Sequence, residues 1–453
     1  MIYRPKFILA LLVPLVIMSL ASPVQATHNA DDHSDNMREV AFSPRSSPAT
    51  QSDLAFIGKL AIAGNYNGFR IFDISNPENP TLVKDVFCRG QQGDVSIWGD
   101  ALVVSVDEVL TGPQCGSGPA VPATLETGWE GLRVFSLKEV LATPADPDGF
   151  TRLQPAADIY IKCGSHTHTG IPHKGHVDIY VASYPLRSGP DCGPHDDPSD
   201  THNPLHEILS IARVNPQHPE QSGGVTEVPI DVPTFNEDPV FLPPPAFNPM
   251  RGCHDIQVHL QLRLAAAVCS SVGQVWDISD PHNPGTLDPV WEVDEPEVQF
   301  YHSALFSEDK TTVIFGDEII VGHCFDGTGS GQLWFYDLAT GDFQSSFNIP
   351  RNQGGAYCSA HMFNNMPGVK QDALVASWYG GGVTVVDFTD RSNPTEIGYY
   401  DPAGGSVWSA YWYNDYIYAS DIPAGTRFLQ FTERSPGRER SSPFPYMNPQ
   451  TQK

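Results

Sequence analysis

The sequence predicts an all-β protein, a seven-bladed β-propeller, and three observations lead to this prediction. Short apolar runs alternate with turns rich in Gly, Asn, Asp and Pro across most of the 453 residues, a pattern typical of many short strands. Long stretches of helical periodicity are nearly absent. A strand-plus-turn unit recurs at a spacing of roughly 40 to 60 residues, as expected for propeller blades of about four strands.

The repeat unit is clearest at residues 60–75, where two apolar strands are joined by Asn67 and Gly68, a dipeptide that favours a tight hairpin. Pro77 and Pro80 then end the ladder, because proline has no amide hydrogen to donate. The unit returns at residues 274–284 and 383–394, with weaker copies at residues 131–137, 208–214, 332–338 and 427–431. These seven units predict seven blades. A tandem of β-sandwiches is the alternative, but it would require longer alternating strands and distinct linkers.

The two ends of the chain differ from the repeats. The first 26 residues combine Arg4 and Lys6, an apolar run and small residues before Ala26, as a secretory signal peptide does. An uncleaved membrane anchor is the alternative, but the apolar run is short for a span. The predicted organisation is a signal peptide at residues 1–26, a disordered leader at 27–52, the β-propeller at 53–432 and a disordered C-terminal tail at 433–453.

The chain is strongly acidic, with a formal net charge of −27. Loss of the signal peptide removes Arg4 and Lys6 and no acidic residue, which changes the charge to −29. Such a surface repels phosphate backbones, so we expect no nucleic-acid partner. No later segment is long and apolar enough to cross a bilayer. We therefore expect a mature protein without a membrane span that is secreted, periplasmic or on the cell surface.

Eight cysteines in an exported chain favour disulfides over a thiolate metal site. A zinc–thiolate site is the alternative, but the chain has no Cys-x-x-Cys pair. Although 105 pairings are allowed, we favour sequential ones because each closes a short loop. They are Cys88–Cys115, Cys163–Cys192, Cys253–Cys269 and Cys324–Cys358.

Four of the predicted blades open a strand with histidine, at a comparable distance before the repeat strand. The residues are His166, His168, His254, His302 and His361. They are expected to open the innermost strands of blades three to six and to face the central channel. His166 and His168 are two apart, hence on one side of a strand. Since neutral imidazole is the commonest transition-metal ligand, the sequence predicts a shared site for copper, zinc or iron. The alternative is that each imidazole hydrogen-bonds the backbone of a neighbouring blade.

Three carboxylates are candidate catalytic residues. Asp94 is expected near the axis in blade two, although a turn aspartate is an equally good interpretation. Asp317 and Glu318 close the next strand of blade five, where they would fix an imidazole tautomer or act as a base. Asp255 should point to the other face of its strand and support a neighbouring blade.

A histidine-rich insertion in blade three is interpreted as a solvated loop that could also gather cations or cover the channel mouth. It contains His173, His176, His195, His202 and His206.

The units with a strong Asp-x-Ser-x-Pro turn, together with the histidine segments in this order, resemble the LVIVD-repeat family of exported β-propellers. The segments are residues 164–169, 253–256, 301–304, 315–318 and 357–361. The resemblance covers most of the chain from about Leu54 to Phe431 and implies a seven-bladed propeller, without a defined activity.

These observations lead to two functional hypotheses. The first is an exported propeller with a histidine-lined metal site at the central channel, acting as a metal-dependent oxidoreductase. Propellers of the selenium-binding and methanethiol-oxidase type similarly gather histidines near the axis, although no motif matches residue by residue. The second is a non-catalytic cell-surface or adhesion scaffold that binds a protein partner. Bound metal distinguishes them, and the small-molecule or protein partner is left open.

Overall fold

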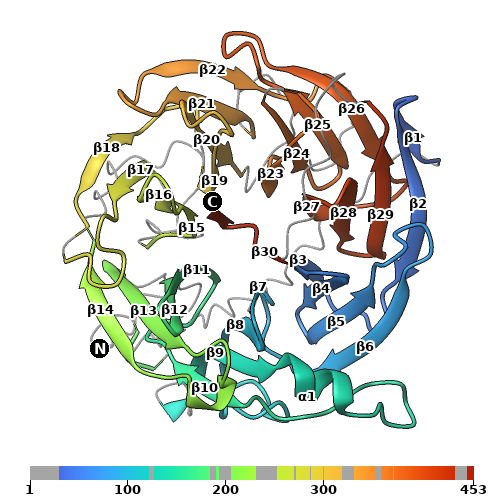
Figure 1. Cartoon of the computed structure of the whole chain (residues 1–453), viewed down its shortest axis with the longest axis vertical. Helices are drawn as coiled ribbons and strands as arrows, with labels where there is room; N and C mark the ends of the chain where they lie inside the picture. Colours follow the sequence, from blue (N-terminus) through green and yellow to red (C-terminus); the bar gives the residue numbers. More distant parts are fainter. Residues whose placement is uncertain are drawn as a thin grey trace, which may run out of the picture.

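The structure is a computed structural model. It describes residues 30–121, 127–183, 190–192, 206–230, 252–269, 272–285, 287–298, 300–318, 331–351, 359–370, 372–433 and 446–453. In these ranges the chain forms seven sheets, arranged as blades around a central axis (Figure 1). The predicted all-β, seven-bladed β-propeller is therefore confirmed. Within the same ranges, no helix has the length and apolar character needed to cross a membrane. The predicted signal peptide at residues 1–26 lies outside the described residues.

Each blade has four antiparallel strands, the first of which lies nearest the axis. Blade 1 is β3 (Gln51–Ile57), β4 (Leu60–Asn65), β5 (Gly68–Asp73) and β6 (Thr81–Phe87). Blade 2 is β7 (Val95–Trp98), β8 (Ala101–Leu110), β9 (Trp129–Ser136) and β10 (Ala157–Tyr160). Blade 3 is β11 (Thr167–His173), β12 (His176–Ala182), β13 (Ile208–Val214) and β14 (Val225–Pro229).

The ring continues in the same order. Blade 4 is β15 (Asp255–His259), β16 (Leu264–Cys269), β17 (Val272–Asp277) and β18 (Pro289–Val293). Blade 5 is β19 (Tyr301–Phe306), β20 (Thr312–Asp317), β21 (Leu333–Asp337) and β22 (Phe343–Phe347). Blade 6 is β23 (Phe363–Asn365), β24 (Ala373–Ser377), β25 (Val383–Asp387) and β26 (Thr395–Asp401). Blade 7 begins with β27 (Val407–Tyr413), β28 (Tyr416–Asp421) and β29 (Gly425–Phe431). Two short helices, α1 (Leu137–Ala142) and η2 (Pro219–Gln221), lie in connections.

The recurring Asp-x-Ser/Thr turn caps the third strand of a blade. In blade 1 the Oδ1 atom of Asp73 accepts a hydrogen bond from the Ser75 amide at 2.8 Å. Asp277 accepts in the same way from the Ser279 amide in blade 4. The side chain thus takes the place of a ladder partner where the strand ends. This explains why the motif recurs at the same position in different blades.

The hydrophobic core lies between neighbouring blades. One cluster joins Ile171 and Tyr180 of blade 3 to Ile256 and Trp276 of blade 4, and all four are almost fully buried. Since a blade cannot cover its own apolar faces, each sheet depends on the next one around the ring.

The N-terminal segment closes the ring. Its strand β2 (Met37–Pro44) pairs with β29 and becomes the outer strand of blade 7. A shorter strand, β1 (Asp32–His33), pairs with β26 in blade 6. The prediction of a disordered leader at residues 27–52 is wrong for these strands, because the exposed edge of β29 supplies the backbone partners that a free leader would lack.

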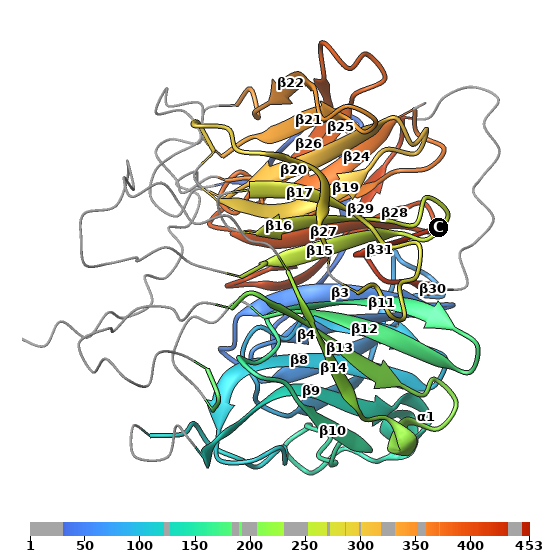
Figure 2. The ribbon, with the colours of Figure 1, turned by 90° about the vertical axis from the view of Figure 1, so that its left-hand side faces the viewer.

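The C-terminal segment enters the centre of the ring (Figure 1), and Figure 2 places the C-terminus at one end of the ring's axis. Its strands β30 (Tyr446–Met447) and β31 (Thr451–Gln452) pair with β3 and β15. Asn448 accepts from the Ile97 amide and donates to the Ile97 carbonyl. Gln452 makes the same pair of bonds with Phe306. The prediction of a disordered tail at residues 433–453 is therefore wrong for residues 446–453. Amide side chains anchor this segment, and it has no alternating apolar residues from which a strand could be predicted.

Three of the four predicted disulfides are present. They are Cys88–Cys115, Cys163–Cys192 and Cys253–Cys269. The last joins the two ends of the β15–β16 hairpin. Cys324 and Cys358 lie outside the described residues.

We predict that Arg427→Met strongly destabilises the closed ring. Arg427 donates to the β2 carboxylate of Glu39 at 2.6 Å and to Asp421 of β28 at 2.8 Å. Asp421 is fully buried, so the variant leaves an unpaired charge, with an expected loss of about 3–5 kcal/mol in the free energy of unfolding. Denaturant titration measures the loss. The control is Arg38→Met in the same strand β2, which removes exposed contacts to Gln430 of β29 and to Glu78 of blade 1 and should change stability by about 0.5 kcal/mol or less. Equal effects of the two variants would refute the closing role of Arg427.

We also predict that Gln452→Ala lowers the free energy of unfolding by about 1–3 kcal/mol, because it removes the acceptor of the buried Phe306 amide and one of the two donors to the Phe306 carbonyl, the other being Asn365. Thermal or denaturant unfolding measures this loss. The adjacent exposed variant Lys453→Ala is the control. A Gln452→Ala protein as stable as the control would show that the Gln452 side chain does not anchor the segment.

Candidate metal centre

Four blades have a histidine at the start of their innermost strand. His166 and His254 immediately precede β11 and β15, His302 is the second residue of β19, and His361 lies just before β23. All four are almost completely buried. The side chains reach the axis because each innermost strand starts at the same end of the ring.

The four imidazoles form a continuous series of ring contacts. The ring centroids of His166 and His254 are 4.4 Å apart, those of His254 and His302 are 3.9 Å apart, and those of His302 and His361 are 4.2 Å apart. Trp408 of β27 extends the series, with its centroid 4.7 Å from that of His361. The structure therefore brings together four of the five histidines that the sequence singled out.

Main-chain carbonyls fix the tautomer of two of these rings. The Nδ1 atom of His254 donates to the carbonyl of His302 at 3.0 Å, and Nδ1 of His361 donates to the carbonyl of Trp408. A carbonyl can only accept, so the proton is on Nδ1 and the lone pair is on Nε2. An outer hydrogen bond of this kind orients a histidine for metal binding.

Burial keeps these imidazoles neutral. It lowers the pKa of His254 and of His302 well below the ordinary value, and neighbouring histidines add to the effect. Burial also lowers the pKa of His361 to about 3. Neutral imidazole is the form that binds metal ions.

Glu318 completes a compact donor set. Its carboxylate oxygens lie 3.5 Å from Nε2 of His302 and 4.0 Å from Nε2 of His361. One donor atom from each of these three residues lies within 4.8 Å of the others. Tyr379 donates its hydroxyl to Glu318 at 2.7 Å. Burial raises the pKa of Glu318 to about 7, while the hydrogen bond from Tyr379 acts in the opposite direction.

His166 lies beside this set with both nitrogens engaged. Its Nε2 accepts from the Gln92 amide at 3.0 Å, and its Nδ1 donates to Asp107 at 2.8 Å. The ring therefore packs against His254 while it is held by blade 2.

His168 lies away from the other histidines. Its nitrogens contact the hydroxyls of Ser96 and Ser105 and the carboxylate of Asp94, within blades 2 and 3. The prediction that it shares one side with His166 fails because β11 begins only at Thr167, so the alternation of a strand does not include His166. His168 packs between the blades and is no part of the His302 and His361 cluster.

Two of the three candidate carboxylates bind backbone amides. Asp94 accepts from the His168 amide at 2.6 Å, and Asp317 accepts from the amides of Phe300 and Gly331 at 2.9 and 2.7 Å. Both are almost fully buried. Asp94 and Asp317 thus position the blade connections, and only Glu318 lies in the donor set.

Other functional neighbours were not predicted from the sequence. Tyr379 directly precedes the three glycines at residues 380–382. Gln92 lies in the connection from β6 to β7, and Asp107 lies in β8 of blade 2, which lacks an axial histidine. Burial, and then the charges of Asp107 and Glu318, raise the pKa of Tyr66 in blade 1. In blade 1, Asn65 caps its own turn by accepting from the Asn67 amide at 2.9 Å.

Comparisons with known proteins support the architecture. Residues 52–87 and 373–402 match the LVIVD repeat. They coincide with blade 1 and with strands β24, β25 and β26 of blade 6. The resemblance to LVIVD-repeat propellers is therefore confirmed. No curated protein matches the chain.

The solved structures that match this chain share little sequence with it. The WD40 β-propeller domain of Doa1 has a TM-score of 0.50 and 10% identity, and the match covers 90% of this chain and 100% of that one. The computationally designed Ika8 protein has a TM-score of 0.47 and 11% identity, covering 86% and 99%. At such identity the likeness to Doa1 shows the fold alone.

We predict that Glu130→Gln changes the pH dependence of stability. Burial, and then the charge of Asp107, raise the pKa of Glu130 in β9 to about 8 from an ordinary 4.5. The unfolded chain releases this proton near pH 4.5 and the folded chain only near pH 8, so the native protein loses stability as pH rises through that window. Below pH 4.5 the variant should have the same pH dependence of unfolding free energy as the wild type. Between pH 4.5 and pH 8 its unfolding free energy should rise relative to that of the wild type, by at most about 1.4 kcal/mol for each unit of the pKa shift.

Unfolding titrations at pH 4 to 9 measure the difference, with Glu139→Gln on the exposed face of α1 as the control. A gap between Glu130→Gln and wild type that stays constant with pH would contradict the buried, neutral state of Glu130.

Proposed function

We propose that this protein is an exported β-propeller metalloprotein in which His302, His361 and Glu318 hold a first-row transition metal at one end of the central channel. The observation that carries this proposal is the convergence of two imidazoles and one carboxylate within 4.8 Å. His254 lies against His302 and is the fourth candidate ligand, because its Nδ1 hydrogen bond leaves the lone pair on Nε2.

The donor set fits a catalytic site better than a closed structural one. Two histidines and one carboxylate occur in catalytic zinc sites and in non-haem iron oxygenases, and both leave coordination positions for water or substrate. Copper also accepts imidazole ligands. When bound, such a metal supplies Lewis acidity or electron transfer. We therefore propose a metal-dependent enzyme, with oxidation of a small molecule as the reaction class.

The surrounding residues have defined roles in this proposal. The Trp408 carbonyl holds His361 in the tautomer that presents Nε2, and Tyr379 orients the carboxylate of Glu318. The buried position of both histidines limits access by bulk water. These contacts preorganise the donors before a metal binds.

An extracytoplasmic location is consistent with this function. Three disulfides favour an oxidising compartment. The acidic net charge of −27 favours cation binding. We place the mature protein outside the cytoplasm, secreted, periplasmic or at the cell surface.

We predict that the His302→Ala/His361→Ala double variant binds one metal equivalent fewer than the wild type. The protein is purified without chelators, and bound copper, zinc and iron are measured by elemental analysis. The control is His218→Ala, which removes an exposed histidine outside the axial donor set. Tyr379→Phe should keep the stoichiometry and weaken the affinity by about 10–100-fold, as is typical when an outer hydrogen bond to a ligand is lost.

Equal metal content in the wild type and the double variant would sink the proposal. In that outcome the histidines pack the channel, and the non-catalytic adhesion scaffold becomes the better interpretation.

A further inference from the structure

A second group of histidines lies at the opposite end of the blade 3 strands from the axial site. His173 ends β11 and His176 begins β12, whereas the axial histidine of the same blade, His166, precedes β11. The sequence suggested a solvated loop here, but His173 and His176 are opposite one another in the last pair of the β11–β12 hairpin. His195 and His202 lie outside the described residues, and His206 is buried.

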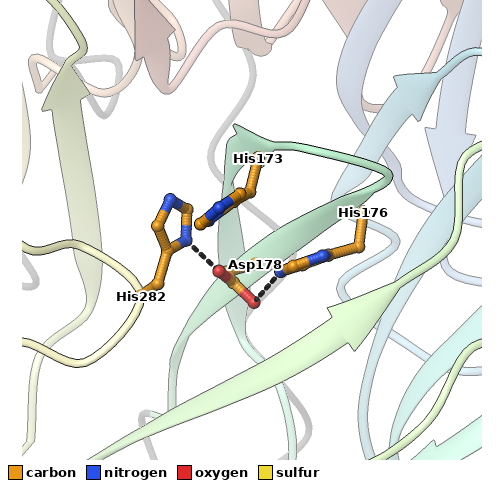
Figure 3. Close-up of side chains that lie close together, drawn as sticks. All are labelled: His173, His176, Asp178 and His282. Carbon is orange, nitrogen blue, oxygen red and sulfur yellow. Dashed lines mark hydrogen bonds and ion pairs between the residues drawn. The ribbon is translucent and has the colours of Figure 1, made fainter.

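Strand geometry places three donors on one face of blade 3. His173 and His176 are cross-strand neighbours, and Asp178 follows His176 by two residues, so all three side chains project from the same face. The fourth member, His282, comes from the turn between β17 and β18 of blade 4, which faces this side of the hairpin (Figure 3). Tyr180 holds that turn by donating its hydroxyl to the Pro281 carbonyl at 2.7 Å.

The four side chains converge closely. The ring centroids of His173 and His282 are 3.5 Å apart, and Nδ1 of His282 donates to Asp178 (Figure 3). Nε2 of His176 lies 3.4 Å from Asp178. One donor atom from each of the four residues lies within 4.8 Å of all the others. A tetrahedral zinc ion, with bonds of about 2.0–2.1 Å, holds its ligand atoms roughly 3.3 Å apart, so a small contraction suffices.

Two details favour a cation over simple packing. Asp178 is buried, with 2% of its side chain exposed, and the arginine beside it, Arg213, lies 3.5 Å away on a side chain that is 60% exposed. Nε2 of His176 is buried and makes no hydrogen bond among the described residues. A divalent ion between the rings would satisfy this nitrogen and the carboxylate together.

We propose that His173, His176, Asp178 and His282 form a second metal site, selective for a first-row divalent transition ion such as Zn²⁺. Three nitrogen donors and one carboxylate suit zinc and disfavour Ca²⁺ and Mg²⁺, which prefer oxygen ligands. The ion joins the β11–β12 hairpin of blade 3 to a turn of blade 4. Its role is to tie neighbouring blades together, because four protein ligands leave no position for substrate. The equivalent turn residues in blades 1 and 6 are Glu78 and Ser392, so neither of those turns offers an imidazole.

The experiment uses the full mature protein that carries His302→Ala/His361→Ala, so that the axial site does not contribute. After chelator treatment and dialysis, Zn²⁺ alone is titrated by calorimetry and the melting temperature is followed. We expect one equivalent of bound Zn²⁺ and a melting temperature that rises with its concentration, as binding to the native state requires. Ca²⁺ and Mg²⁺ should produce neither effect.

Adding His173→Gln and His282→Gln to this background should abolish both the heat of binding and the shift in melting temperature. His173→Gln alone, at an exposed position, keeps the test valid if the combined protein folds poorly, and it should weaken binding at least tenfold. His218→Gln is the matched control and should leave binding unchanged. Absence of stoichiometric Zn²⁺ binding, or its full retention by the combined variant, would overturn this proposal. Neither result bears on the axial site, which is measured separately.

Discussion

The pairing of β2 with β29 is the contact on which the rest of the structure depends. It joins the two ends of the propeller in one blade and is supported by Arg427, which bridges β2 and β28. An open ring would expose one edge of blade 7 and one face of blade 1, and neither could be covered locally. Closure also sets the angle between blades, and this angle directs side chains from different blades to one axial point.

The axial histidines are an outcome of this geometry. His254, His302 and His361 are far apart in sequence, yet their rings are in contact because three innermost strands start at the same end of the ring. The next layer of the channel is also polar. Tyr411 and Gln450 donate to Asp53, and burial with the nearby charge of Asp94 raises the pKa of Asp53 well above its ordinary value. The C-terminal segment thus covers a filled channel, and the donor set lies at its other end.

Local patterns explain how much of this could be predicted from the sequence. Turn chemistry repeats because the third strands of blades 1, 4 and 6 end at an aspartate that accepts from the amide two residues later, so Asp73, Asp277 and Asp387 reveal these blades directly. The axial histidines follow from their offset to those turns. His168 was misplaced because the irregular segment before β11 breaks the alternation that relates it to His166. Glu318 was predicted as one of several candidates, since a sequence does not tell which carboxylates bind backbone amides. The Tyr379 contact depends on a turn whose direction the glycines allow but do not specify.

The terminal segments could not be predicted for a different reason. Residues 30–44 and 446–453 are polar and short, so by composition they resemble solvated tails. Their order comes from backbone partners supplied by strands distant in the sequence, such as β29 and β15. The same reasoning applies to the His282 cluster. A histidine in a polar turn has no local meaning, and its proximity to Asp178 arises only when blades 3 and 4 pack together. Both histidine clusters therefore depend on how the blades pack against one another. The axial cluster combines side chains of several blades at the axis, and the His282 cluster combines side chains of two neighbouring blades.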